Sequence, residues 1–499
     1  MENEVAKNSN LWRWQALKSG FDAEKALKPA ASAELPNSRE GLNQSDTFIQ
    51  RVVADSRLVT KGDLFIALPG DPGPRFNPSY VSQADGHDFV GAALANGAVA
   101  AIVARAVPVA LPQILVSDTY DALWHLGDMA RKRLGKPVCA ITGSSGKTTA
   151  KNFLTAALSA YSPPGSFNNH IGVPLALANA RLDAPAWVFE IGTSGPGEIG
   201  PLANMVKADL AILLNVHNAH IENFSGREAL ITEKRQIFAP FTKTMSQDEN
   251  SGEDDAGIKI AEASLGLPGY SFGDLDGADA RILDVQGDRL VLTLFGEKLQ
   301  ARIPGGGAHR ASTLAAVILA TKLLGRDLSP ALNLDDSAVP SGRGNVLCTA
   351  GVTVVDDSYN ANPASMLAAI TAFCQRDSRC KIAVLGEMRE LGDESATAHR
   401  NLLTQLGGFD KVFLIGPAMM HLAVSEGLFD EQTAALATEQ GSGLGHDNMR
   451  FYPEASEILL KDLAGLIHPE DALLIKGSNR VFWSRDFVSK LLKAIAEKL

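Results

Sequence analysis

Residues 137–149 predict a strand, a tight turn and a helix in immediate succession. Residues 138–142 are apolar and partly β-branched, as in a buried strand. A glycine, two serines and a second glycine follow, and helical spacing of apolar residues begins after them. A buried strand that turns through glycines into a helix is typical of α/β domains with parallel sheets. The turn and the first helical residues are Gly143, Ser144, Ser145, Gly146, Lys147, Thr148 and Thr149.

This turn has the composition of a loop that binds nucleotide phosphates. Glycines let backbone N–H groups approach phosphate oxygens, and a helix N-terminus favours negative charge. Lys147 adds a mobile cation, and the Thr148 hydroxyl can hold Mg²⁺. The spacing is Gly-x-x-Gly-Lys-Thr, with Ile141 where the longer form of the motif has its first glycine. We therefore predict a site for a nucleotide and Mg²⁺, against the alternative of an ordinary strand-to-helix turn that contains a lysine.

Length and composition limit the class of protein. A chain of 499 residues is long enough for about three domains, each with its own core. The net charge of −11 argues against binding nucleic acid or anionic lipid, and the longest apolar run, 89–104, is too short for stable membrane insertion. The four cysteines form no C-x-x-C pair, so we expect a reduced protein in the cytoplasm.

Apolar runs that alternate with helical stretches predict an α/β fold in three domains. Residues 1–136 form a small N-terminal α/β domain, in which 1–45 are partly irregular around a short helix. Residues 137–330 form a central domain with a mostly parallel sheet of the P-loop type, and residues 331–499 form a C-terminal Rossmann-like domain with a doubly wound sheet.

Shorter patterns predict single elements within these domains. A helix is expected at about 89–95, before a strand at 99–103, and a hairpin is expected from 281–285 and 289–294. Residues 309–324 predict a long alanine-rich helix. The acidic run 246–255 has no periodicity and is interpreted as an exposed insertion.

Polar residues follow two apolar runs of the central domain. Glu190 ends one predicted strand, and Asn215, His217 and His220 follow the next. Because ligands gather at the carboxyl ends of parallel strands, these residues are expected to lie near the phosphate loop. Thr148 and Glu190 are the types of residue that hold Mg²⁺ beside a nucleotide, and His220 is either a second metal ligand or a structural histidine.

Four stretches, of which the first is the phosphate loop, resemble the Mur ligase family, over about residues 55–477. They are Thr-Gly-Ser-Ser-Gly-Lys-Thr-Thr at 142–149, Phe-Asn-Asn-His-Ile-Gly-Val-Pro-Leu at 167–175, Asp-Asp-Ser-Tyr-Asn-Ala-Asn-Pro at 356–363 and Leu-Gly-Glu-Met-Arg-Glu-Leu-Gly at 385–392. The resemblance implies an N-terminal domain for a UDP-sugar, a central ATP-binding domain and a C-terminal ligase domain. It also implies that ATP converts a substrate carboxylate into an acyl phosphate, which an amine then attacks.

The resemblance assigns roles position by position. It implies that residues 143–149 bind ATP together with Arg343 and Asp357, and that Lys147, Glu190, His220 and Lys234 are catalytic. It further implies that Lys234 is carbamylated. The metal-site residues implied are Thr148, Glu190, His220 and Lys234, and the substrate-binding residues are Ser56, Arg57 and Asn169. From spacing alone, Ser56 and Arg57 read as an exposed turn.

The last two motifs point to the family member that joins D-alanyl-D-alanine to UDP-N-acetylmuramoyl-tripeptide, and we expect a monomer. The closest alternative is a sister ligase that adds the third amino acid, but the Asp-Asn-Pro-Arg stretch expected of it is absent. A nucleotide-binding module that forms no bond is the other alternative. Two segments depart from the family pattern: His-Asn-Ala-His at 217–220, and residues 309–313, where Arg310 and Thr313 replace asparagines expected near the adenine.

Overall fold

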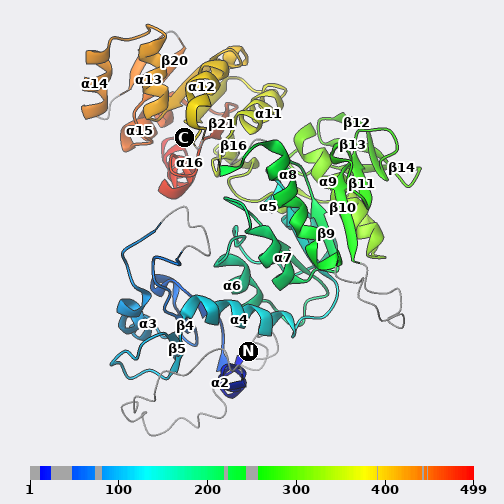
Figure 1. Cartoon of the computed structure of the whole chain (residues 1–499). Coiled ribbons are helices and arrows are strands. Elements are labelled where there is room, and N and C mark those ends of the chain that lie inside the picture. The colour runs from blue at the N-terminus through cyan, green and yellow to red at the C-terminus, as the bar shows by residue number, and fades with distance from the viewer. Residues whose placement is uncertain are drawn as a thin grey trace. The chain divides into compact units, whose positions relative to one another are not determined.

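The computed structural model describes residues 12–23, 48–73, 81–217, 223–242, 257–389, 391–440, 443–446 and 448–499. By its internal contacts the chain forms two compact units, residues 1–271 with 320–327 and residues 272–319 with 328–499 (Figure 1). The predicted α/β class is confirmed, whereas the division at residues 136 and 330 remains a prediction. Within the described part of the chain, no helix combines the length and the apolar character needed to cross a membrane.

The first unit begins with a small parallel sheet in the order β3-β4-β5-β6. The predicted strand near residue 100 and the helix before it are both present. Ahead of this sheet, two short antiparallel strands and a helix form the described part of the N-terminal segment. The elements are β1 (Trp12–Arg13), α2 (Trp14–Ala23), β2 (Phe48–Ile49), β3 (Val52–Val53), β4 (Leu64–Ile66), α3 (Val90–Ala95), β5 (Ala100–Val103), β6 (Gln113–Leu115) and α4 (Thr119–Arg131).

The N-terminal segment is anchored by tryptophan. The Trp12 indole is buried and donates a hydrogen bond of 2.9 Å to the Ala178 carbonyl, and the Arg133 guanidinium lies 3.9 Å from its ring centroid. Trp14, Leu17 and Phe21 of α2 are buried in the same core. The predicted short helix therefore exists, starts at Trp14 and is part of the core.

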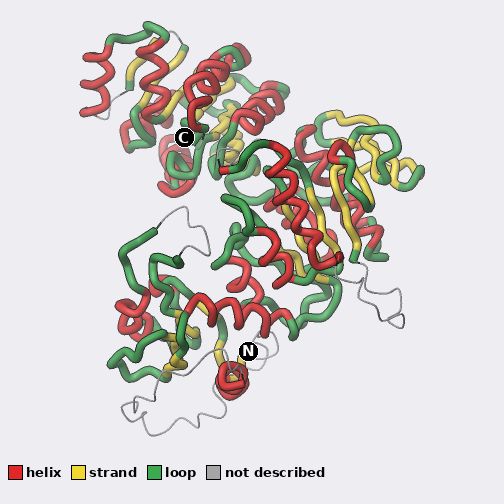
Figure 2. Tube along the Cα trace, in the orientation of Figure 1, coloured by secondary structure: helices red, strands yellow, loops and turns green. Residues whose placement is uncertain are grey.

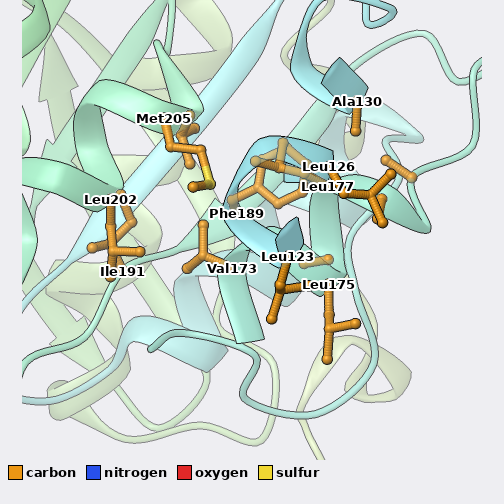
Figure 3. Packing of buried hydrophobic residues seen from close by; sticks show 14 of the residues in the cluster. Leu123, Leu126, Ala130, Val173, Leu175, Leu177, Phe189, Ile191, Leu202 and Met205 are labelled. Atoms are coloured by element: carbon orange, nitrogen blue, oxygen red, sulfur yellow. The ribbon is translucent and has the colours of Figure 1, made fainter. Parts of the chain in front are cut away.

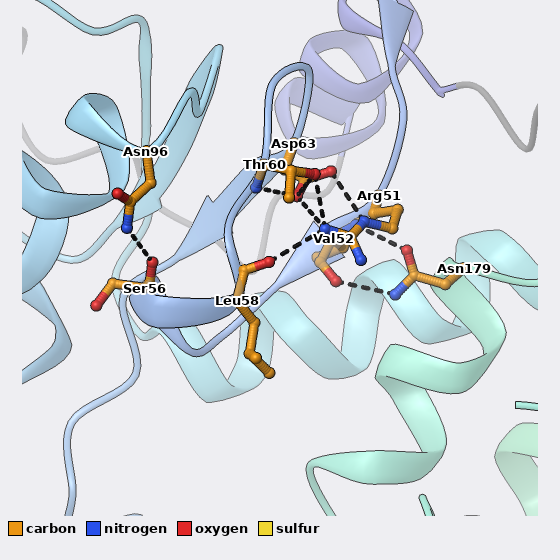
Figure 4. A network of polar contacts seen from close by, with 8 residues as sticks. All are labelled: Arg51, Val52, Ser56, Leu58, Thr60, Asp63, Asn96 and Asn179. Atoms are coloured by element: carbon orange, nitrogen blue, oxygen red, sulfur yellow. Dashed lines mark hydrogen bonds and ion pairs between the residues drawn. The ribbon is translucent and has the colours of Figure 1, made fainter. Parts of the chain in front are cut away.

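A polar network fixes the start of the first sheet (Figure 4). The Arg51 guanidinium donates to both oxygens of the buried Asp63 carboxylate, at 3.1 and 2.6 Å. The side chain of Asn179 accepts from the Val52 N–H at 2.8 Å and donates to the Val52 carbonyl at 2.9 Å. Asn179 thereby takes the place of a neighbouring strand for β3 and links it to the helix that ends beside Asn179.

Four parallel strands in the order β10-β9-β7-β8 follow in the first unit. Side chains of α4, α6, α7 and β8 form one core beside this sheet, as Figure 3 shows for Leu126, Leu177, Phe189 and Met205. This core continues into the N-terminal residues, so the two segments share apolar side chains. The elements are β7 (Val138–Thr142), α5 (Lys147–Leu158), α6 (Gly172–Ala178), β8 (Trp187–Glu190), α7 (Ile199–Val206), β9 (Leu210–Leu213), α8 (Arg227–Arg235) and β10 (Ile258–Glu262). The insertion 246–255 and most of 1–45 lie outside the described residues.

The chain enters the second unit within β11 (Tyr270–Gly273). Strands β12 (Ala280–Gln286), β13 (Arg289–Leu294) and β14 (Glu297–Arg302) form an antiparallel meander, which contains the predicted hairpin. The long alanine-rich helix predicted after it is α9 (Ala308–Leu323).

The rest of the second unit is a seven-stranded sheet in the order β15-β16-β21-β17-β18-β20-β19, with its five central strands parallel. Neighbouring residues of β17 alternate between two cores: Ala383 and Leu385 join one, Ile382 and Val384 the other. Helices therefore cover both faces, as the doubly wound prediction requires (Figure 2). The strands are β15 (Asn345–Thr349), β16 (Val352–Asp357), β17 (Lys381–Gly386), β18 (Lys411–Ile415), β19 (Leu444–His446), β20 (Met449–Tyr452) and β21 (Ala472–Lys476). The helices are α10 (Ser329–Leu332), α11 (Pro363–Cys374), α12 (Ser395–Leu403), α13 (Pro417–Ser425), α14 (Glu431–Gln440), α15 (Glu457–Leu466) and α16 (Phe487–Lys498).

Candidate active site

The phosphate loop has the predicted strand, turn and helix. β7 ends at Thr142, and α5 begins at Lys147 with Gly146 as its N-cap. Gly146 has φ of 78°, a left-handed conformation that strongly favours glycine over other residues. Among the described residues no side chain caps this helix, which leaves its first N–H groups for an anion.

Asn215, which follows β9, holds the loop in shape. Its side chain accepts from the Ser145 N–H at 3.0 Å and donates to the Ser145 carbonyl at 3.2 Å. Its backbone carbonyl accepts from the Ser144 N–H. The Lys147 ammonium donates to the Gly143 carbonyl at 2.7 Å. Asn215 was predicted to follow this strand, but no binding or catalytic role was predicted for it. The geometry makes it the side chain that braces the turn.

Thr148 and Glu190 lie together, as predicted. The Thr148 hydroxyl donates to Glu190 Oε2 at 2.8 Å, and both residues are buried. The other carboxylate oxygen, Oε1, is buried and has no hydrogen-bond donor among the described residues. An anionic oxygen without a donor, beside a hydroxyl at a phosphate loop, fits a divalent cation with oxygen ligands. These residues therefore suit Mg²⁺.

Two residues that the sequence analysis missed adjoin this pair. The Ser166 hydroxyl lies 3.2 Å from Thr148 Oγ1. Lys151, one helical turn after Lys147, is 1% exposed and donates to the Pro163 carbonyl at 2.9 Å and to the Gly165 carbonyl. Neither belongs to a motif, and their proximity depends on a segment whose path the sequence does not reveal.

Lys234 is buried in α8, and its environment lowers its pKa. Desolvation, followed by repulsion from Lys147, lowers the pKa of Lys234 to about 7, although the neighbouring Glu233 opposes the shift. The carboxylate of Glu233 accepts from the Gly197 and Ile199 N–H groups, both at 2.8 Å. The structure thus brings Lys234 into the neighbourhood of the phosphate loop in a partly neutral state. His220 lies outside the described residues.

The predicted substrate-binding residues of the first unit occupy separate places. Ser56 and Arg57 form a short 3₁₀ turn, in which the exposed Arg57 guanidinium pairs with Asp55 at 2.6 Å. The Asn169 side chain accepts from the Ile171 and Gly172 N–H groups at the start of α6. Asn169 therefore shapes a loop in this structure, and Arg57 presents its charge to solvent.

Arg343 and Asp357 belong to the second unit. The Arg343 guanidinium lies 4.1 Å from the centroid of the Tyr359 ring. Asp357, at the end of β16, accepts from the buried ammonium of Lys476 at 2.7 Å, and Lys476 also donates to the Asn360 carbonyl. This ion pair between a buried ammonium and a partly exposed carboxylate lies at neighbouring strand ends and fixes the start of the Asp-Ser-Tyr-Asn-Ala-Asn-Pro stretch.

Arg310 has a structural task in this unit. Its guanidinium, almost fully buried, donates to four backbone carbonyls, those of Gly305, Gly306, Arg343 and Gly344, at distances from 2.7 to 3.3 Å. Arg310, which departs from the family pattern, thus links two loops through its hydrogen bonds.

The chain is similar to known proteins over most of its length. Residues 141–321 match the Mur ligase middle domain, and residues 342–479 match the Mur ligase, glutamate ligase domain. The chain is 30% identical to a UDP-N-acetylmuramoyl-tripeptide–D-alanyl-D-alanine ligase of Rickettsia prowazekii, over 92% of this chain and 97% of the relative.

Solved structures give the same result. A crystal structure of MurF from Acinetobacter baumannii has a TM-score of 0.73 and 26% identity, with 97% of this chain and 99% of that chain covered. MurF ligase from Thermotoga maritima in complex with ADP has a TM-score of 0.68 and 27% identity, with 90% and 98% covered. From its matched domains and its nearly full-length relatives, the chain belongs to the Mur ligase family.

Proposed function

We propose that this protein is an ATP-dependent ligase that joins D-alanyl-D-alanine to the terminal carboxylate of UDP-N-acetylmuramoyl-tripeptide, in peptidoglycan precursor synthesis. The observation that carries the proposal is the match, along nearly the whole of both chains, to a ligase named for this reaction. The loop at 143–149 and the Thr148–Glu190 pair supply the matching chemistry.

The reaction has two steps. The tripeptide carboxylate attacks the γ-phosphorus of ATP, which forms an acyl phosphate and releases ADP. The amine of D-alanyl-D-alanine then attacks the acyl carbon, which forms the amide and releases phosphate and a proton. In the first step one anion approaches another, so Lys147 and the N–H groups at the start of α5 offset the repulsion and hold the phosphates in line.

Mg²⁺, when bound, neutralises phosphate charge during the transfer. Thr148 and Glu190 would hold it, and His220 would contribute to a second site by family resemblance. Oε1 of Glu190 supports this assignment, because it is buried without a donor among the residues that the structure describes and a buried anionic oxygen requires a positive partner.

Lys234 is proposed to become an anion by carbamylation. A neutral amine attacks CO₂, and the product is a carbamate and a proton. With a pKa of about 7, about half of the Lys234 side chains are neutral at pH 7, whereas an ordinary lysine with a pKa of about 10.4 is almost entirely protonated. The charge change would place an anion in the site and remove the repulsion between two ammonium groups.

The remaining parts of the proposal follow the family. Residues 1–136 bind the UDP-sugar through Ser56 and Arg57, residues 137–330 bind ATP, and residues 331–499 contribute Arg343 and Asp357. Asn169 contacts substrate, and the protein acts as a monomer in the cytoplasm. The exposed charge of Arg57 supports a role in binding a diphosphate.

Phosphate release from ATP tests the proposal. The purified protein is supplied with Mg²⁺ and UDP-N-acetylmuramoyl-tripeptide, with and without D-alanyl-D-alanine, and the product is weighed by mass spectrometry. We expect release that depends on the dipeptide, and a product heavier by D-alanyl-D-alanine minus water. The sister-ligase alternative predicts activity only with the UDP-linked dipeptide and a free amino acid. A binding module predicts no product with either pair.

A further inference from the structure

The segment 163–169 crosses the region between α5 and the end of β8 and is tied down at three points. At its start, the Lys151 ammonium binds the Pro163 and Gly165 carbonyls. Near its end, the Asn168 carbonyl accepts from the Gly192 N–H at 2.8 Å. At its end, the Asn169 side chain accepts from the Gly172 N–H. Ser166 lies between these ties.

Holding the segment with a buried lysine costs free energy. Lys151 is 1% exposed, so its ammonium is removed from water, and its hydrogen bonds to the Pro163 and Gly165 carbonyls offset part of that free-energy cost. An apolar residue of similar volume would fill the space without the cost. The buried Lys151 ammonium therefore indicates that the position of segment 163–169 is important, in addition to the filling of the core.

The hydrogen bonds among Ser166, Thr148 and Glu190 show which atoms the segment positions. A hydroxyl has one hydrogen to donate and two lone pairs. Thr148 gives its hydrogen to Glu190 Oε2, so Ser166 is the donor in its contact with Thr148 Oγ1. The hydrogens then run in one direction, from Ser166 to Thr148 to Glu190. One lone pair of Thr148 and the Oε1 atom of Glu190 remain for a cation.

We propose that Lys151 is a positioning residue that holds Ser166 as the donor to Thr148, and that this contact presents the Thr148 lone pair and the Glu190 carboxylate to a divalent cation. The inference rests on the proposed function, because it concerns the cation that accompanies ATP. Hydrogen-bonded partners behind metal ligands fix the orientation of the ligands, and their loss typically weakens metal affinity about 10- to 100-fold.

The test measures cation binding without turnover. Mn²⁺ is titrated into the full-length protein saturated with ADP, and free Mn²⁺ is followed by electron paramagnetic resonance. The variants are Lys151→Met, which keeps the volume and removes the donors, Ser166→Ala, and the double variant. Lys132→Met removes an exposed lysine elsewhere in the same unit and is the matched control.

We expect each single variant to bind Mn²⁺ about 10- to 100-fold more weakly than the wild type, and the control to bind as the wild type. Because both changes remove the same contact, the double variant should bind no more weakly than the weaker single variant. If Ser166→Ala binds Mn²⁺ as the wild type, or the two losses multiply, the inference is wrong. Ser166→Ala keeps the Lys151 contacts, so it is decisive even if Lys151→Met does not fold. Absence of Mn²⁺ binding in the wild type would refute the metal site of the proposed function itself.

Discussion

Replacement of Glu190 by glutamine should change stability in opposite directions in the presence and absence of ligand. In the ligand-free protein, Glu190 Oε1 is buried and has no hydrogen-bond donor in the part of the chain that the structure describes. A buried unsatisfied polar group costs about 1–3 kcal/mol, and more if it is charged. Glutamine removes the charge and keeps a carbonyl that accepts from Thr148. We therefore expect Glu190→Gln to stabilise the ligand-free protein by about 1 kcal/mol, which is about 2 °C in melting temperature for a unit of this size.

With ligand the order reverses. At a concentration 100 times its dissociation constant, MgADP stabilises the wild type by about 2.7 kcal/mol, or about 5 °C. The variant lacks the anionic oxygen that we assign to the cation, so it should gain much less from MgADP than the wild type. The assay is the melting temperature of both proteins, by calorimetry, with ADP alone and with MgADP.

Glu233→Gln is the matched control. Both oxygens of Glu233 already accept backbone hydrogen bonds, so glutamine places an amide against an N–H group. This variant should melt lower than the wild type without ligand and keep its gain from Mg²⁺. The reasoning is refuted if Glu190→Gln melts lower without ligand and retains the full Mg²⁺-dependent gain.

Three other perturbations test separate parts of the structure. Lys147→Met should abolish product formation in the phosphate-release assay while the protein still melts cooperatively, because only the loop's mobile cation is lost; a variant with wild-type turnover would contradict the site. Because the pKa of Lys234 falls to about 7 in the folded protein, the unfolded state binds more protons between pH 7 and about 10.4, so this residue makes stability rise with pH across that interval. The neutral amine of Lys234 is lost as pH falls below 7, so the ¹³C signal of a carbamate formed from labelled CO₂ should disappear there. The variant Lys234→Ala cannot form this carbamate at any pH, and it should regain part of its turnover when a short carboxylic acid is added. Arg310→Met should lower the free energy of unfolding of the second unit by about 1–3 kcal/mol, because four carbonyls lose their donor. Arg289→Met, at an exposed position of β13, should leave it unchanged in denaturant titrations.

Much of the fold follows from apolar runs of the sequence. The runs at 138–142 and 381–386 became β7 and β17, because a strand buried on both faces is apolar throughout. The hairpin around Gly287 was also predicted, since its turn residues separate two runs of strand-forming residues. The edge strand β15 gave no such signal, because its residues are half-buried and mixed in polarity.

Contacts between residues that are distant in the sequence limit how much of the site can be predicted. Thr148 and Glu190 were paired correctly, because each ends or follows a strand and parallel strands share an edge. Lys151 and Asn215 were not given roles. Their partners are backbone atoms, which have no signature in the sequence. Arg310 was seen only as a departure from a family pattern, and its four carbonyl partners are known only from the path of the chain.

The tryptophan anchor near the N-terminus determines how far the chain can be shortened. Residues 1–47 look dispensable from their composition, and a shortened variant that starts at residue 48 would keep every motif. It would also remove four buried side chains, those of Trp12, Trp14, Leu17 and Phe21, from the core of the first unit. The uncovered apolar surface would favour self-association, so such a variant is expected to aggregate although its catalytic residues are all present.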